Sequence, residues 1–318
     1  MALIDSFIKD VGKASAGDVL HVPGTPTLTF NGLAALDIPK GVTLLGDRGL
    51  NGSPGALLRK NVSSGGWKDA MFNLENDVKI FGFILEGEML PESETPLRDE
   101  SLYLKGLTMF GKTGIEIANN EIRGWAYAGV FADHCPTAGR PWIHHNFGHD
   151  NQACGEGYFV NVNYGDILME ANLMDKNRHS FTGGGQSGEK AEVRFNVHLG
   201  SGCAQGCAHF DVHECESGGL FAGGEYHIHH NTVKQNPLGI TEKTSAVLHI
   251  RENPAVGVYF ENNLIETDWG SGSNYRGWQK PHWFSRDRGS TDTGRVFCKN
   301  NMWKGKLYPD NNTILWVS

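Results

Sequence analysis

The segment Ile115-Glu-Ile-Ala-Asn-Asn120-Glu-Ile decides the fold, because its pattern returns along the chain. An alternating apolar run leads to a polar residue, then an asparagine, then a further apolar residue. The corresponding segments are Trp142-Ile-His-His-Asn146-Phe, Leu168-Met-Glu-Ala-Asn172-Leu-Met, Val193-Arg-Phe-Asn196-Val, His227-Ile-His-His-Asn231-Thr-Val, Tyr259-Phe-Glu-Asn-Asn263-Leu-Ile and Phe297-Cys-Lys-Asn-Asn301-Met-Trp. The shortest interval is 24 residues, from Asn172 to Asn196, and the longest is 38, from Asn263 to Asn301. Such recurrence indicates a repeat protein.

Each interval fits one coil of three short strands and three turns, with the surplus residues in loops. Asparagine tolerates the left-handed backbone of tight corners, and its stacked amides can hydrogen-bond as a ladder from coil to coil. Segments Val42–Gly46, Val78–Gly82 and Leu102–Gly106 look like the same strand with glycine at the corner. An antiparallel sandwich is the alternative, but the regular markers favour a β-helix. We therefore predict one all-β domain over residues 1–318, a right-handed parallel β-helix.

Composition supports a folded solenoid and argues against two classes of partner. The 318 residues are 39% apolar and include 42 glycines, which suits many strands joined by tight turns. The net charge of −8 argues against a general nucleic-acid binder, and no apolar run is long enough to cross a membrane. The amphipathic start is not a signal peptide. We expect a secreted or cell-surface protein whose signal is absent from this sequence, with a cytoplasmic location as the alternative.

The six cysteines do not decide a metal site or a disulfide pattern. They allow 15 pairings, and the sequence does not choose among them. Cys203 and Cys207 have the spacing of half a zinc site, but no second pair matches it. The metal content therefore stays open at this stage.

Val42-Thr-Leu-Leu-Gly-Asp-Arg-Gly, followed by the recurrent Asn-Asn-x-Ile corners, resembles the pectate-lyase-like superfamily of right-handed parallel β-helices. The resemblance implies an amphipathic N-terminal helix that caps the open end of the core. Residues 1–14 fit this role; the residues on their apolar face are Leu3, Ile4, Phe7, Ile8 and Val11. Because the superfamily includes lyases, hydrolases, esterases, epimerases and phage tailspikes, the fold does not decide the reaction.

A second strand of each coil precedes the later marker asparagines. The segments are Gly129–Asp133, Tyr158–Val162, His179–Gly183, His209–His213 and Leu248–Arg251. If the coils stack in register, these segments lie side by side, about 4.8 Å apart, in one parallel sheet. Alternation then directs Phe210 and Val212 inward, and His209, Asp211 and His213 outward. The resemblance implies that this sheet carries the substrate groove.

Two strings on this sheet gather unlike chemical groups, Asn177-Arg178-His179 and His209-Phe-Asp211-Val-His213-Glu214. They resemble a group of uncharacterised right-handed β-helix proteins with Asn-Arg-His followed by His-x-Asp-x-His. The candidate catalytic residues are Arg178, His179, His209, Asp211 and His213. The candidate substrate-binding residues are Asp133, Tyr158, Asn177, Glu214, His249 and Arg251. The alternative is a hydrogen-bonded structural face, whereas the pairs His144-His145 and His229-His230 have the position of ordinary turn residues.

The leading functional prediction is a carbohydrate-active enzyme that cleaves a polysaccharide or oligosaccharide by β-elimination. A histidine, either His179, His209 or His213, would remove the proton beside a uronate carboxylate, and Arg178 or Arg251 would neutralise the developing charge. Aromatic faces suit sugar rings, and Tyr158, together with Trp125 or Tyr127, would line the groove.

Three alternatives remain open from the sequence. A glycoside hydrolase would pair Asp211 with Asp133 or Glu214, since that reaction needs two carboxylates. The same three acids are hard oxygen ligands, so Ca²⁺ is a possible cofactor, and the histidines are ligand types for a transition metal. A tailspike-like or structural solenoid would bind glycans without catalysis.

Overall fold

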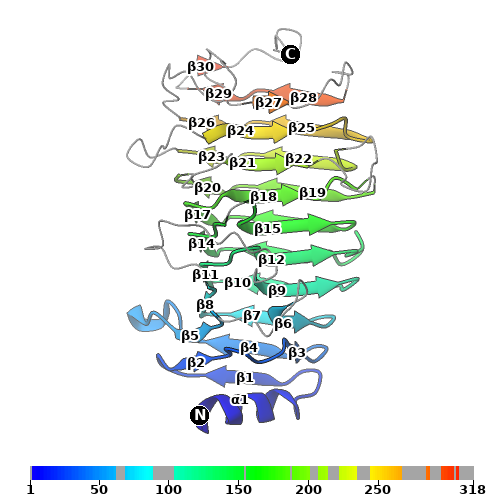
Figure 1. Cartoon of the computed structure of the whole chain (residues 1–318). Coiled ribbons are helices and arrows are strands. Elements are labelled where there is room, and N and C mark those ends of the chain that lie inside the picture. The colour runs from blue at the N-terminus through cyan, green and yellow to red at the C-terminus, as the bar shows by residue number, and fades with distance from the viewer. Residues whose placement is uncertain are drawn as a thin grey trace.

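The computed structural model describes residues 2–61, 69–88, 104–153, 155–186, 188–200, 207–213, 222–234, 244–266, 284–286, 295–303 and 306–307. These residues form a right-handed parallel β-helix in which successive coils stack into an elongated rod, with the one α-helix of the described residues at the N-terminal end (Figure 1). The predicted fold class is confirmed. Among the described residues, no helix has the length and apolarity needed to cross a membrane.

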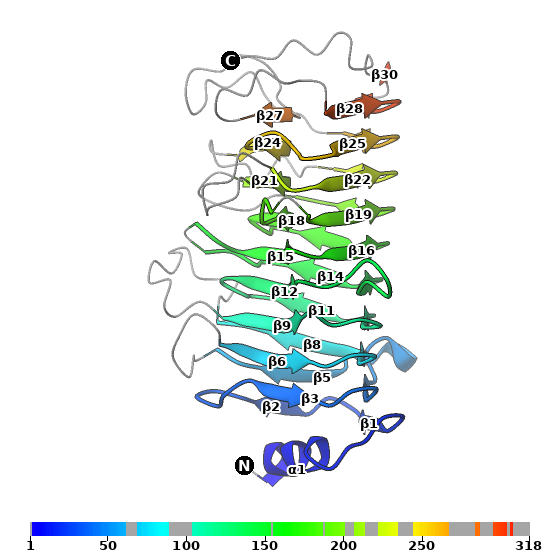
Figure 2. The same ribbon diagram turned by 90° about the vertical axis from the view of Figure 1, so that its right-hand side faces the viewer.

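Three long sheets run along the rod (Figure 2). Sheet A consists of β1 (Val19–Val22), β4 (Thr43–Gly46), β7 (Lys79–Phe81), β10 (Glu116–Ala118), β13 (Trp142–His144), β16 (Asp166–Glu170), β19 (Lys190–Arg194), β22 (Glu225–His229), β25 (Gly257–Glu261) and β28 (Val296–Lys299). Sheet B consists of β2 (Thr27–Thr29), β5 (Ala56–Arg59), β8 (Phe83–Glu86), β11 (Glu121–Arg123), β14 (Phe147–His149), β17 (Leu173–Asp175), β20 (Val197–His198), β23 (Thr232–Val233), β26 (Leu264–Ile265), β29 (Met302–Trp303) and β30 (Lys306–Leu307).

Sheet C consists of β3 (Leu36–Ile38), β6 (Ala70–Leu74), β9 (Lys105–Phe110), β12 (Ala128–Asp133), β15 (Tyr158–Asn163), β18 (His179–Gly183), β21 (Cys207–Val212), β24 (Thr244–Ile250) and β27 (Phe284–Arg286). Neighbouring strands of all three sheets pair in parallel, except the antiparallel pair β29 and β30. A short 3₁₀ turn, η1 (Leu50–Gly52), lies outside the sheets.

The predicted asparagine ladder lies between sheets A and B. Each marker is buried, and its side-chain Nδ2 donates a hydrogen bond to a backbone carbonyl of the preceding coil. Asn172 is typical: its Oδ1 accepts the backbone N–H of Asn146 at 3.0 Å, and its Nδ2 donates to Asn196 and to the carbonyl of Ile143. The ladder satisfies polar groups that would otherwise be buried without partners at every corner.

The left-handed residue of each corner is not the marker itself, as the sequence suggested, but the residue before it. Ala171 has φ of 53°, and Phe195 has φ of 56°. The other residues in this position are Asn119, His145, His230, Asn262 and Asn300. His145 and His230 are therefore turn residues, as predicted. The marker position therefore requires a side-chain amide and not a left-handed backbone. The left-handed residue before it differs from corner to corner.

Two of the three segments predicted to end in a glycine corner, Val42–Gly46 and Val78–Gly82, have the predicted position. Gly46 and Gly82 lie at the ends of the predicted strands in sheet A, where their backbones approach closely. A Cβ built on Gly46 would lie 2.3 Å from the carbonyl oxygen of Gly82, so only glycine fits. The third segment was assigned wrongly: Gly106 lies inside β9 of sheet C.

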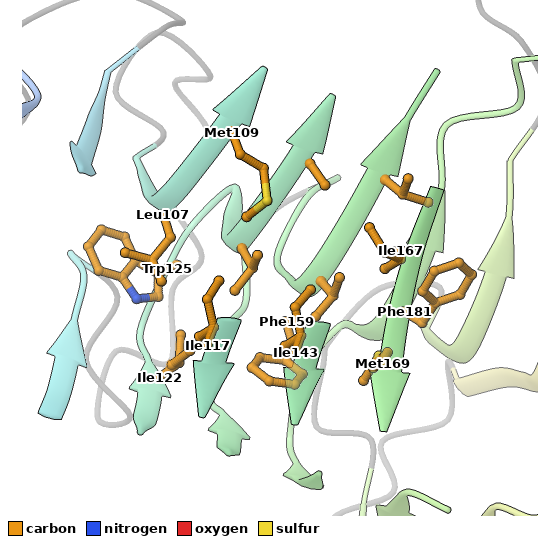
Figure 3. Packing of buried hydrophobic residues seen from close by; sticks show 14 of the residues in the cluster. Leu107, Met109, Ile117, Ile122, Trp125, Ile143, Phe159, Ile167, Met169 and Phe181 are labelled. Carbon is orange, nitrogen blue, oxygen red and sulfur yellow. The ribbon is translucent and has the colours of Figure 1, made fainter. Parts of the chain in front are cut away.

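Apolar side chains from all three sheets fill the interior of the rod (Figure 3). Helix α1 (Ala2–Val11) covers its N-terminal end, as predicted, and is shorter than the expected 14 residues. Phe7 and Val11 are buried, and the ring of Phe7 lies 6.0 Å from that of Phe30. Leu3, which was expected on the buried face, is 53% exposed, whereas the neighbouring Ile4 packs against the core.

Candidate functional site

The predicted alignment of second strands is confirmed in sheet C. Strands β12, β15, β18, β21 and β24 are consecutive neighbours. Tyr158 is in register with His179, and His179 is in register with Ala208. Thr182, Asp211 and His249 are also in register on three successive strands. The two candidate strings therefore meet on adjacent coils.

Asp211 is the centre of the site, and its side chain is fully buried. The guanidinium of Arg251 makes two hydrogen bonds to it, from Nη2 to Oδ2 at 2.8 Å and from Nε to Oδ1 at 3.3 Å. Nε2 of His179 lies 3.2 Å from Oδ2, at an angle that makes no hydrogen bond. Nδ1 of His249 lies 3.5 Å from Oδ1. One carboxylate thus contacts a cation and two imidazoles from the coils before and after it.

These contacts assign protonation states. Burial by itself raises the pKa of Asp211, but the charges of Arg251 and the neighbouring histidines outweigh it, so the pKa lies well below its usual value. Burial lowers the pKa of His179 well below its usual value, and the charge of Arg178 acts in the same direction. At neutral pH the site therefore combines an ionised carboxylate with a neutral His179.

The ring of His179 is held on two sides. It stacks on Tyr158, with centroids 5.6 Å apart and planes within 16°. Its Nδ1 lies 2.8 Å from the carbonyl oxygen of Ala208 and 3.0 Å from the amide nitrogen of the same residue, so the backbone of Ala208 fixes this side of the ring. With a fully buried side chain, His179 is placed to position Asp211 rather than to contact a ligand directly.

Arg178 is a buried cation without a carboxylate partner among the described residues. Only 8% of the residue is exposed. Its Nη1 lies 3.4 Å from the hydroxyl of Tyr158, and its guanidinium carbon is 5.8 Å from that ring's centre. Its Nε is buried and has no hydrogen-bond partner. Since an unpaired buried charge is costly, this guanidinium is suited to receive an anion.

His209 does not point outward with Asp211, and that prediction is wrong. It is 1% exposed, and its ring lies 5.1 Å from that of His198, which itself contacts Phe210 of the core at 4.5 Å. Strands of sheet C turn two successive residues inward near their starts, as Phe159 and Val160 of β15 also show. Strict alternation fails there, so His209 and Phe210 both face the core.

The remaining candidates are dispersed. Asn177 is buried in a second ladder, where its Oδ1 accepts from Nδ2 of Asn151 at 2.7 Å and its Nδ2 donates to the carbonyl of Gly148. His213 follows β21, and its charge acts on Asp211. Asp133 lies at the end of β12, hydrogen-bonded to His134. Glu214 lies outside the described residues.

Three strand steps separate β12 from β21, and the two residues are also offset along the strands, so Asp133 and Asp211 are more than about 14 Å apart. This distance is too long for one Ca²⁺ to be shared, and it exceeds the separation of a hydrolase carboxylate pair. Within the part of the chain that the structure describes, no three His, Cys, Asp or Glu side chains are grouped to hold a metal.

Two residues beside the site were not predicted. Glu156 hydrogen-bonds the side chain of Tyr158 and, together with burial, raises the pKa of that tyrosine well above its usual value. Lys105 is 3% exposed, its Nζ lies 4.5 Å from the ring centre of Tyr127, and burial lowers its pKa to about 8. Tyr127 in turn packs edge-on against Tyr158. Neither residue has a distinctive motif, although both stand beside the aromatic positions that the sequence singled out.

Comparison with known proteins gives a limited result. No protein-family model matches the chain, and no curated protein matches it. The chain is similar to the structure "Geobacillus virus E2 - ORF18", with a TM-score of 0.47 and 11% identity over 96% of this chain and 59% of that one. It is also similar to the gp42 tailspike of Acinetobacter phage vb_AbaP_AS12, with a TM-score of 0.39 and 10% identity over 94% of this chain and 60% of that one. The chain thus spans about three fifths of the length of each. The resemblance to the Asn-Arg-His group stays a prediction.

Proposed function

We propose that the protein binds an acidic polysaccharide on the outer side of sheet C and cleaves it by β-elimination at Asp211 and its neighbours. One observation carries the proposal. A fully buried carboxylate contacts Arg251 and two imidazoles, and an unpaired guanidinium, that of Arg178, lies beside the same His179. Such a concentration of buried charge is costly for stability and is typical of functional sites.

The groups suit the steps of β-elimination. The reaction removes the C5 proton beside a uronate carboxylate, and the negative charge that develops there must be neutralised. The electron pair then forms the C4–C5 double bond as the C4–O glycosidic bond breaks, and the leaving oxygen takes up a proton. Arg178 is the candidate to receive the carboxylate, because its Nε has no partner in the described part of the chain. A bidentate contact from a guanidinium to a carboxylate is both strong and directional.

His249 is the better candidate for the base. Its side chain is 11% exposed, whereas that of His179 is fully buried. Its Nδ1 lies 3.5 Å from Oδ1 of Asp211, so the carboxylate holds the ring in place for proton removal. Arg251, with 20% of its side chain exposed, stands beside both. His179 is then a positioning residue, and His209 has no part in the chemistry because it faces the core.

A polymeric ligand suits the site because cationic and aromatic side chains continue along the rod from Asp211. Lys105, Tyr127 and Tyr158 continue the row of cationic and aromatic groups over the coils that precede Asp211. Ammonium groups attract acidic sugars, and aromatic rings pack on the apolar faces of sugar rings.

The test is a screen of acidic and neutral polysaccharides that reads near-ultraviolet absorbance and reducing ends together. The proposal expects absorbance from an acidic polymer, with strong loss in His249→Ala and Arg178→Ala. His227→Ala is the matched control, because His227 lies on sheet A and stacks on Tyr259. Reducing ends without absorbance would indicate a hydrolase. Binding without any product would indicate the non-catalytic alternative, which the low exposure of the whole cluster favours.

A further inference from the structure

Two histidines form a pair inside the β-helix. His198 ends β20 of sheet B, and His209 lies in β21 of sheet C in the same coil. Their residue exposures are 0% and 1%. The ring centroids are 5.1 Å apart, and the ring planes meet at 77°. Neither residue belongs to the cluster around Asp211, which lies on the outer side of the sheet.

Within the described residues, none of the four ring nitrogens of this pair has a hydrogen-bond partner, and all four are buried. Buried side-chain nitrogens normally have partners, and each exception calls for an explanation such as a bound water or ion. Asn196, the ladder residue of the same coil, has partners for its side-chain oxygen and nitrogen, whereas both imidazoles of the pair have none. The histidine pair therefore indicates a bound species between the two rings.

In the preceding coil, two residues beside the histidine pair carry side-chain atoms that can bind a metal. Met174 of β17 is in register with His198 and is fully buried. Ser180 of β18 lies opposite His209, between the registered pairs His179 with Ala208 and Phe181 with Phe210, and is 1% exposed. Imidazole and thioether side chains thus face the same part of the interior from neighbouring coils.

We propose that His198 and His209 bind a copper(I) ion inside the β-helix, with the thioether of Met174 as a third ligand. Imidazole is a good ligand for copper, and a thioether selects the monovalent, soft ion. The charge of the site agrees with this choice. No carboxylate among the described residues raises the pKa of either histidine, so a divalent ion would be buried without compensation.

The two imidazoles are already in the form that binds metal. Burial lowers the pKa of His209 to about 4, and burial together with the charge of His209 lowers the pKa of His198 well below its usual value. Both rings are therefore neutral at pH 5.5 as well as at pH 7.

The site is enclosed, so the ion enters as the coils form. The test therefore unfolds the full-length protein in urea and refolds it without oxygen in the presence of copper(I) supplied as its acetonitrile complex, with zinc(II) in a parallel sample. After desalting, metal is counted by mass spectrometry. The expected result is one copper and no zinc per chain, with an X-ray absorption spectrum of two nitrogen ligands and one sulfur.

The variants separate binding from folding. Met174→Leu conserves volume, so circular dichroism should show a folded protein that retains less copper. His198→Asn and His209→Asn should retain none, whereas His227→Gln, on the outer side of sheet A, should retain as much as the parent. Folded parent protein without copper, zinc retained in its place, or equal copper in Met174→Leu and the parent without sulfur ligation would each overturn the proposal.

Discussion

The guanidinium of Arg251 lies against the carboxylate of Asp211 in the preceding coil, with Nη2 2.8 Å from Oδ2. The Asp211 side chain is fully buried, and that of Arg251 is 20% exposed. Because the folded-state pKa of Asp211 lies below its unfolded value near 3.8, its stabilisation is complete above that value and is lost only as pH falls below it.

Asp211→Asn should lower the free energy of unfolding by about 3 kcal/mol, because it removes a fully buried carboxylate that accepts two hydrogen bonds from Arg251. Urea unfolding at pH 7 measures this loss. The exposed pair of Lys190 and Glu225 is the control, and Glu225→Gln should change stability by less than about 0.5 kcal/mol. Equal effects in the two variants would contradict the assignment of Asp211 as a buried electrostatic centre.

Arg178→Met should leave the free energy of unfolding unchanged or raise it, because it removes a buried cation that has no carboxylate partner among the described residues. The same variant should bind an acidic polymer about 10- to 100-fold more weakly, since it loses a charge-assisted contact. Unfolding and binding curves on one preparation check both parts. A clear loss of stability with unchanged binding would show that the arginine is structural.

Asn172→Ala should destabilise the protein by about 2–4 kcal/mol, because it removes the partner of the backbone N–H of Asn146, a donor to the carbonyl of Ile143 and one of the bonds to Asn196. Asn73→Ala serves as the matched control, since Asn73 is exposed and should cost less than about 0.5 kcal/mol. Urea midpoints give the comparison, and similar values for the two asparagines would argue against the ladder as a main source of stability.

Ala171→Gly should stabilise the protein by up to about 1 kcal/mol. Ala171 has φ of 53°, a left-handed conformation that strains any residue with a Cβ but not glycine. Ala191→Gly, in the middle of β19, should instead destabilise, because glycine adds freedom only to the unfolded chain there. Thermal melting of the two variants is sufficient, and opposite shifts are expected.

Between pH 7.5 and pH 4, the free energy of unfolding of the metal-free protein should fall by about 3 kcal/mol because His209 takes up a proton more readily when unfolded. Its pKa is about 4 when folded and near 6.5 when unfolded, so its contribution is complete above pH 6.5 and declines as pH falls toward 4. His209→Gln cannot titrate, and its stability should fall less steeply over this interval. Parallel slopes for parent and variant, measured by urea unfolding in the presence of a chelator, would contradict the buried neutral state.

The periodic features of the molecule could be predicted because each one repeats. The markers from Asn120 to Asn301 defined the coils, and counting back from them aligned His179 with the strand that carries Asp211. The cap helix followed from one apolar face, although Leu3 was placed wrongly because periodicity does not show where the core ends.

The local departures from periodicity could not be predicted. In an ideal strand, side chains alternate, so His209 would point outward if Phe210 points inward. In sheet C both side chains face the core. Glu156 and Lys105 approach the site through Tyr158 and Tyr127, contacts that depend on how loops return to the sheet. The sequence predicted His179, His209 or His213 as the base, whereas the proposed base is His249. Side-chain exposure favours His249, and exposure depends on how the coils pack.

The contacts of Asp211 reach one coil back, to His179, and one coil forward, to His249 and Arg251. No single repeat therefore contains the site. A gene duplication that added a coil elsewhere in the stack would lengthen the rod and leave these distances unchanged. A coil inserted between His179 and Arg251 would part the carboxylate from one of its partners. Length and chemistry can thus evolve independently in this molecule, except across these three coils.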